Sequence, residues 1–101
     1  MPDAPRWTFL TNHAHVLFCI ARDPGVRLRD VAARVGITER AAQRIVADLD
    51  RDGYLERDRI GRRNHYRIHP ELHLRHPIEQ HLAVGELIAL LDPGDPATSV
   101  P

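Results

Sequence analysis

The chain has 101 residues, which is enough for one small domain. Its 14 arginines are matched by 14 acidic residues, so the formal net charge is zero, and its single cysteine excludes an internal disulfide. No apolar run reaches the roughly 18 residues of a membrane-spanning helix, and the first residues, MPDAPRW, lack the apolar stretch of a signal peptide. We therefore expect a cytoplasmic protein with no membrane partner.

The charges are distributed unevenly along the chain. Residues 1–68 hold 13 arginines and 9 acidic residues, a surplus of +4, whereas residues 69–101 hold 1 arginine and 5 acidic residues. A local basic surface matters more for nucleic-acid binding than the net charge of the whole chain. The first two thirds of the chain therefore remain compatible with binding nucleic acid.

The first ten residues predict an extended arm, because Pro2 and Pro5 precede the aromatic residues Trp7 and Phe9. These aromatic side chains would pack either on the same subunit or on a partner.

A helix is expected over residues 12–22, capped by Thr11 and ended by the Asp-Pro-Gly sequence that follows. Every residue from 16 to 21 is apolar, so this helix would be buried on more than one side. One side would meet the next two helices, and the other the last helix or a second subunit. We accordingly predict Leu17 and Ile20 at a dimer interface, and Cys19 as a buried, unreactive thiol.

Residues 28–52 predict a helix-turn-helix. A first short helix has apolar residues at helical spacing and ends at Gly36, and Thr38 is a good N-cap for the second helix. The inward residues of the second helix share this spacing: Ala42, Ile45, Val46 and Leu49. Val26–Leu28 is expected to form a short strand before the first helix, and Gly53 to end the second.

A β-hairpin is expected over residues 54–69. YLERD and NHYRI alternate in the manner of strands, and the turn between them, Arg59–Arg63, centres on Gly61. Residues 54–68 hold five arginines against Glu56 and Asp58. A basic hairpin directly after a polar helix is typical of a wing.

The final predicted helix occupies residues 77–92, with Pro77 at its first position. Its apolar stripe would contribute to the dimer interface through Ile78, Leu82, Gly85, Ile88 and Leu91. A glycine in mid-helix costs about 1 kcal/mol relative to alanine, so we expect another helix to approach closely at Gly85. Residues 1–92 would form one domain, and residues 93–101 a disordered tail.

This order of elements resembles the winged helix-turn-helix domains of the MarR and ArsR families of bacterial transcriptional regulators, which are mainly α with a small β-hairpin wing. VGITERAAQRIVADLDRDGYLER is similar to the MarR recognition helix and first wing strand, and GRRNHYRI to the ArsR wing. LRHPIEQHLAVGELIALL resembles the ending of small actinobacterial regulators of this type. The stretch from Leu28 to Ile68 carries the match, and the resemblance covers about 80 of the 101 residues.

The resemblance implies that the second helix enters the major groove of DNA while the hairpin contacts the backbone or minor groove. Its implied DNA-binding residues are Thr38, Arg40, Gln43 and Arg44 on the helix, and Arg59, Arg62, Arg63 and Asn64 on the hairpin. These residue types fit, because Arg pairs with guanine, Gln with adenine, and wing arginines with phosphate or the minor groove. We expect Arg22, Arg27 and Arg34 to be plain surface residues.

Two features depart from the resemblance. Glu39 lies in the first turn of the recognition helix, where it would repel phosphate unless it accepted a hydrogen bond from a cytosine amino group. The last helix is shorter than the dimerisation helices of full MarR proteins, so any dimer would be compact.

The sequence offers little support for a metal, a cofactor or catalysis. Six of the seven histidines, at positions 13, 15, 69, 73, 76 and 81, are candidate ligands but lack a spacing that places them on one helical face. Residues 28–31 lack the cysteines found there in ArsR-type sensors. Phosphate-binding loops, H-E-x-x-H and nucleophile elbows are absent. We expect no metal or cofactor and no enzymatic activity.

The sequence therefore predicts a sequence-specific DNA-binding regulator, associated with the nucleoid and acting as a homodimer on an inverted repeat of double-stranded DNA. An effector of unknown structure could bind between the first and last helices. Two alternatives stay open. The zero net charge and Glu39 allow a winged-helix module that binds protein instead of DNA, and the histidines allow a metal- or redox-responsive sensor of the ArsR kind.

Overall fold

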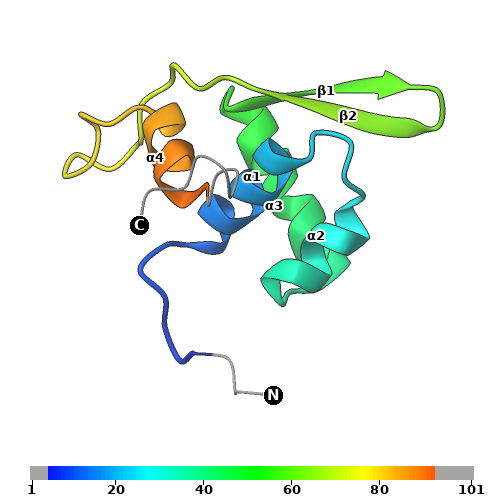
Figure 1. The fold of residues 1–101 in the computed structure, drawn as a ribbon, viewed down its shortest axis with the longest axis horizontal. Coiled ribbons are helices and arrows are strands. Elements are labelled where there is room, and N and C mark those ends of the chain that lie inside the picture. The colour runs from blue at the N-terminus through cyan, green and yellow to red at the C-terminus, as the bar shows by residue number, and fades with distance from the viewer. Residues whose placement is uncertain (1–4, 93–101) are drawn as a thin grey trace, which may run out of the picture.

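The computed structural model describes residues 5–92 and has four helices and one β-hairpin (Figure 1). The elements are α1 (Asn12–Arg22), α2 (Leu28–Val35), α3 (Glu39–Arg51), β1 (Leu55–Ile60), β2 (Arg63–Ile68) and α4 (Val84–Leu91). Helix α1 is central, with contacts to α2, α3, α4 and β2. The predicted tail, residues 93–101, and the first four residues of the predicted arm lie outside the described residues.

The predicted helix-turn-helix is confirmed with its local signals. Gly36 adopts a left-handed conformation (φ +87°), and its N–H donates to the carbonyl of Ala32 at 2.8 Å. Thr38 then caps α3, because its hydroxyl oxygen accepts a hydrogen bond from the backbone N–H of Ala41 at 3.0 Å. Gly53, just beyond α3, is also left-handed (φ +85°). The sequence thus determines this region locally.

The hydrophobic core joins all the elements. Helix α3 buries the four inward residues predicted for it, and the hairpin and α4 contribute Leu55, Tyr66 and Val84. Cys19 is buried as predicted, and burial raises the pKa of its thiol. Ile20, which is predicted at a dimer interface, is fully buried within its own subunit, and the interface itself stays a prediction. Leu17 is only 6% exposed and lines an apolar groove.

The short strand predicted at Val26–Leu28 does not form. Asp23 instead organises a turn: its carbonyl accepts the N–H of Val26 at 3.0 Å, and its Oδ1 accepts the N–H of Gly25 at 3.2 Å. Leu28 is already the first residue of α2. We call Asp23–Val26 the pre-α2 turn.

The predicted hairpin is present, with a tighter turn than expected. The pairing of Ile60 with Arg63 leaves only Gly61 and Arg62 in the turn, so Arg59 and Arg63 are strand residues. Gly61 has a φ of +64°, which favours glycine. The hairpin extends away from the helices (Figure 1), which is the geometry of a wing.

The last helix is shorter than predicted, since α4 begins at Val84 and not near Pro77. Residues 72–74 pair with residues 82–84 instead: Leu74 N–H donates to Leu82 O at 2.9 Å, and Val84 N–H to Leu72 O at 2.7 Å. A helix over 77–92 would break both hydrogen bonds. Ile78 consequently lies in a loop and is 81% exposed.

The close approach predicted at Gly85 is present, but its partner is wrong. A Cβ placed at Gly85 would lie 2.8 Å from the Cβ of Pro70, and Gly85 N–H donates to Pro70 O at 2.9 Å. The neighbour is therefore the segment that leaves the hairpin and not another helix. Gly85 also lies in the first turn of α4 and not in mid-helix.

Candidate nucleic-acid interface

The outward face of α3 is polar and accessible. Arg40, Gln43 and Arg44 are exposed, on the side of the helix away from the buried residues Ile45 and Leu49. No ion pair or side-chain hydrogen bond occupies these three side chains within residues 5–92. They are consequently free to meet a ligand.

Two constraints act at the N-terminal end of this face. The Thr38 oxygen is engaged as the N-cap, which leaves only its hydroxyl hydrogen for an external acceptor. Glu39 is exposed in the first turn, where a negative charge favours the helix dipole. The same charge disfavours a phosphate at this end of α3.

The predicted DNA-binding residues of the hairpin differ in exposure and in hydrogen bonding. Arg59 pairs across the strands with Asn64, and Arg59 is exposed whereas Asn64 is half-buried. Arg62 is exposed in the turn. Arg63 does not point to an unoccupied surface, because its Nη2 donates to the carbonyl oxygen of Gly25 at 2.6 Å.

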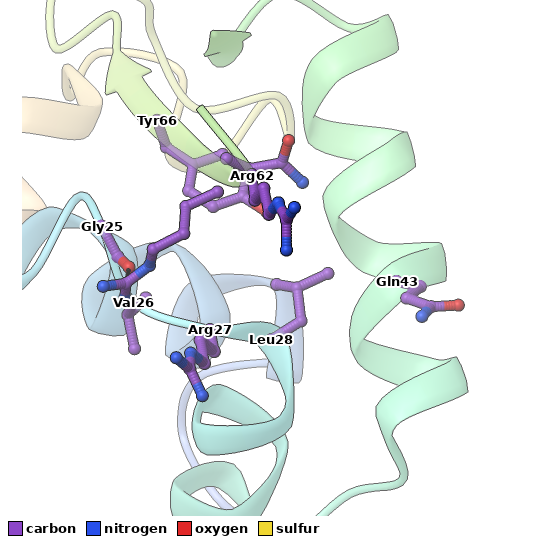
Figure 2. A pocket seen from close by; sticks show the side chains of 9 residues that line it. Gly25, Val26, Arg27, Leu28, Gln43, Arg62 and Tyr66 are labelled. Carbon is purple, nitrogen blue, oxygen red and sulfur yellow. Dashed lines mark hydrogen bonds between the residues drawn. The ribbon is translucent and has the colours of Figure 1, made fainter. Parts of the chain in front are cut away.

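A groove joins the hairpin to the helix-turn-helix. It has a volume of about 420 Å³, and three parts of the chain line it: β2 with its turn, the segment before and into α2, and α3 (Figure 2). Its lining residues are Gly25, Val26, Arg27, Leu28, Gln43, Arg62, Arg63, Asn64 and Tyr66. The lining contains three arginines and no carboxylate, so the groove is suited to an anion.

The groove brings together some of the predicted residues and adds one. Gln43, Arg62, Arg63 and Asn64 line it, whereas the other predicted DNA-binding residues, Thr38, Arg40, Arg44 and Arg59, lie outside it. Arg27, expected to be a plain surface residue, also lines it. Arg27 is the N-cap of α2 but makes no capping hydrogen bond through its side chain. A basic residue at a position that normally favours Ser, Thr, Asp or Asn was the signal in the sequence.

Several acidic residues of the hairpin and of the end of α3 are paired with arginines. Arg57 pairs with Asp50 at 3.6 Å, and Arg75 with Asp52 at 3.1 Å. A hydrogen bond from Arg67 lowers the pKa of the Glu56 carboxyl, chiefly because it stabilises the carboxylate. These pairs neutralise charge at the base of the hairpin and the end of α3, whereas Arg27, Arg40 and Arg62 make no ion pair within residues 5–92.

The histidines serve in local contacts. His13 Nε2 lies 2.9 Å from Asp48 Oδ2, and His73 Nδ1 lies 2.7 Å from the carbonyl of Gln80. His69 lies between Glu56 and Glu71, at 3.6 and 3.4 Å. Across residues 5–92, no three side chains of the metal-binding types come together as a site.

Apolar surface is exposed on the side of the arm and α4. Trp7 and Phe9 pack edge to face with ring centroids 4.9 Å apart, yet they are 64% and 92% exposed. Leu90 on α4 is 79% exposed. A groove of about 390 Å³ between α1, the end of α3 and the segment before α4 contains Leu17 and Leu82 among its lining residues.

A third groove lies between the first and last helices and the base of the hairpin. It has a volume of about 440 Å³. Its lining residues are mostly apolar: Ile20, Ala21, Pro24, Tyr66, Arg67, Ile68, Pro70, Gly85, Ile88 and Ala89. Of the remaining predicted interface residues, Gly85 and Ile88 therefore border this groove, and Leu91 is half-buried on α4.

Comparisons with known proteins agree with this geometry. The chain is similar to the PcaV transcriptional regulator from Streptomyces coelicolor, solved in complex with its natural ligand, at 31% identity and a TM-score of 0.53. The similarity covers 61% of this chain and 46% of PcaV, so the chain spans about half the length of that relative. No match is found among curated proteins. Within residues 5–92, no helix is long and apolar enough to span a membrane.

The family assignment rests on a profile match that covers more than half of the chain. The profile of the MarR family matches residues 8–63, from the arm through α1, the helix-turn-helix and β1 to the first residue of β2. These are the elements that carry the exposed face of α3 and the turn of the hairpin. The chain therefore belongs to the MarR family of transcriptional regulators.

Proposed function

We propose that this protein is a sequence-specific DNA-binding transcriptional regulator that acts as a homodimer on an inverted repeat. The observation that carries the proposal is the basic groove between α3 and the hairpin, with Arg27, Arg62 and Arg63 in its lining and no carboxylate. It adjoins the exposed face of α3, so one duplex can engage both.

In the proposed complex, α3 lies in the major groove. Arg40 and Arg44 are suited to the O6 and N7 acceptors of guanine, and Gln43 to adenine. The hairpin turn reaches the neighbouring backbone or minor groove with Arg62 and Arg59, and Arg27 supplies a further phosphate contact. Base contacts would then come from α3 and positioning contacts from the groove.

The proposed homodimer uses the apolar surface on the side of the arm and α4. Trp7, Phe9 and Leu90 are exposed, and Leu17 and Leu82 line the adjoining groove. A small domain gains stability when such a surface is covered. Two-fold symmetry would place two copies of α3 in successive turns of the major groove, so the half-sites would lie about one helical turn, or 34–36 Å, apart.

The proposed effector site is the groove of about 440 Å³ between α1, β2 and α4. Its volume falls in the range of roughly 300–1,000 Å³ typical of small-molecule sites. The mostly apolar lining favours an apolar molecule, because Arg67 at its edge is already paired with Glu56. A ligand in this groove would contact the residues of β2 at the base of the hairpin.

The proposal is tested by selecting bound sequences from random duplex DNA and then titrating salt. We expect an inverted repeat to be enriched. We also expect the logarithm of affinity to fall linearly with the logarithm of salt concentration, with a slope of about −0.9 for each neutralised phosphate. A protein-binding module would enrich no sequence and show no such slope. Fluorescence microscopy should place the protein at the nucleoid.

A further inference from the structure

Besides the ion pair of Arg57 with Asp50 on α3, the hairpin is anchored to the pre-α2 turn. The pre-α2 turn lies beside β2, where Tyr66 N–H donates to Pro24 O at 2.9 Å and Arg63 Nη2 donates to Gly25 O at 2.6 Å. A Cβ placed at Gly25 would lie 3.8 Å from the ring of His65. Two hydrogen bonds from β2, from residues 63 and 66, thus hold the hairpin against the segment that leads into α2.

The pre-α2 turn is built to present these two carbonyls. Asp23 satisfies the N–H groups of Gly25 and Val26, and Pro24 has no N–H of its own. No strand ladder can extend along this segment, so only the carbonyls of Pro24 and Gly25 are available to β2. One of them is taken by a backbone N–H and the other by a guanidinium.

Arg62 and Arg63 are neighbours in sequence, but their surroundings differ. Within the described part of the chain, Arg62 has no hydrogen bond or ion pair, and it lies in the turn at the edge of the groove. Arg63 is the first residue of β2, and its guanidinium is committed to Gly25 O. A hydrogen bond from an ionised donor is roughly twice as strong as a neutral one. Arg63 is therefore placed to hold the hairpin, and Arg62 to meet an external anion.

We propose that Arg63 is a positioning residue: it docks the hairpin on the pre-α2 turn and so holds Arg62 at the groove shared with Arg27 and Gln43. This inference rests on the proposed DNA-binding function. Two antiparallel strands alone are marginally stable in water, so the half of the hairpin beyond Tyr66 needs such an anchor to keep one orientation. Without it, Arg62 would sample many positions before binding and contribute less to affinity.

The docking itself is tested in the free protein by hydrogen exchange. We expect Arg63→Ala to speed exchange of the Tyr66 amide about tenfold, because the neighbouring contact to the pre-α2 turn is lost. Arg62→Ala is the matched control and should leave this rate unchanged. Arg63→Lys keeps the charge but has a side chain one bond shorter, so it should resemble Arg63→Ala. An unchanged Tyr66 amide in both Arg63 variants would overturn the docking, whether or not the protein binds DNA.

The role in binding is tested by a double-mutant cycle on the selected duplex. If Arg63 acts by placing Arg62, Arg63→Ala should weaken binding severalfold in the wild type and less than twofold in the Arg62→Ala background. Independent phosphate contacts would instead give multiplied losses in the double variant. Multiplied losses would sink the positioning role. Absence of DNA binding by the wild type would contradict the proposed function and leave the exchange result to decide the docking.

Discussion

In the proposed complex, Arg44 contacts base edges, whereas Arg62 contacts the phosphate backbone or the minor groove. It lies on the exposed face of α3, outside the basic groove, and has no partner within residues 5–92. We expect Arg44→Ala to weaken binding to the selected duplex by about 1–3 kcal/mol and to relax the base preference at one position of each half-site. Arg62→Ala should weaken selected and scrambled duplexes alike and flatten the salt slope. An unchanged ratio of the two affinities in Arg44→Ala would contradict the placement of α3 in the major groove.

Asp48 links the folding free energy to pH. The pKa of its carboxyl is lowered, chiefly by the hydrogen bond with His13 and further by Arg51. The ionised form therefore favours the folded state. This contribution is fully present above the ordinary aspartate pKa of about 4 and is lost as the pH falls through the lowered folded value.

The prediction is tested by measuring the midpoint of thermal unfolding of the wild type and of variants between pH 3 and pH 7. Asp48→Asn should lower the midpoint at neutral pH, and its difference from the wild type should shrink below about pH 4. Glu79→Gln, at an exposed loop position with no ion pair within residues 5–92, is the control and should follow the wild-type curve. A constant difference between Asp48→Asn and the wild type over the whole range would show that Asp48 titrates alike in both states.

At the scale of elements, Gly85→Ala tests whether an added methyl group raises or lowers the free energy of unfolding. Glycine to alanine in a helix normally stabilises by roughly 1 kcal/mol. At Gly85 the new Cβ would lie 2.8 Å from Pro70 Cβ and 3.1 Å from Pro70 O, so α4 and the segment after the hairpin would have to separate. We expect Gly85→Ala to destabilise the protein in urea unfolding, while Glu86→Ala on the exposed side changes little. A more stable Gly85→Ala protein would contradict the close approach.

The elements also show which structural features a sequence determines locally. Gly36, the Thr38 cap and the helical spacing of apolar residues fix the helix-turn-helix within a few residues, so its prediction was confirmed. The last helix was overextended because residues 72–74 pair with residues 82–84, which no local pattern indicates. The strand at Val26–Leu28 was wrong because Asp23 closes a turn just before it.

In the candidate site, too, some features follow from the local sequence and others depend on tertiary contacts. The exposed positions of Gln43 and Arg62 could be predicted, because one follows from helical spacing and the other from a glycine-containing turn. The participation of Arg27 and the hydrogen bond from Arg63 to Gly25 O depend on how the hairpin packs beside the pre-α2 turn. That arrangement is tertiary, and residue spacing carries no trace of it.

At the scale of the whole molecule, the proposed dimer predicts a separation between folding and association. Leu90 is 79% exposed in the single subunit, so Leu90→Glu should leave the subunit folded but monomeric. Ile60→Glu, at a comparably exposed isoleucine of the hairpin, is the control and should remain dimeric. Sedimentation at micromolar concentration, together with circular dichroism, measures both. A folded wild-type monomer under these conditions would refute the dimer.

The docking of the hairpin uses a main-chain oxygen, and this has an evolutionary consequence. Every amino acid supplies the same carbonyl at position 25, and a Cβ there meets only ordinary contacts, so relatives could vary this position without moving the hairpin. Position 63 lacks that freedom, since few side chains reach so far with a charged donor. Substitutions in the pre-α2 turn would therefore leave the orientation of the hairpin unchanged. A substitution at position 63 would be rarer, and it would change how the hairpin is oriented toward DNA.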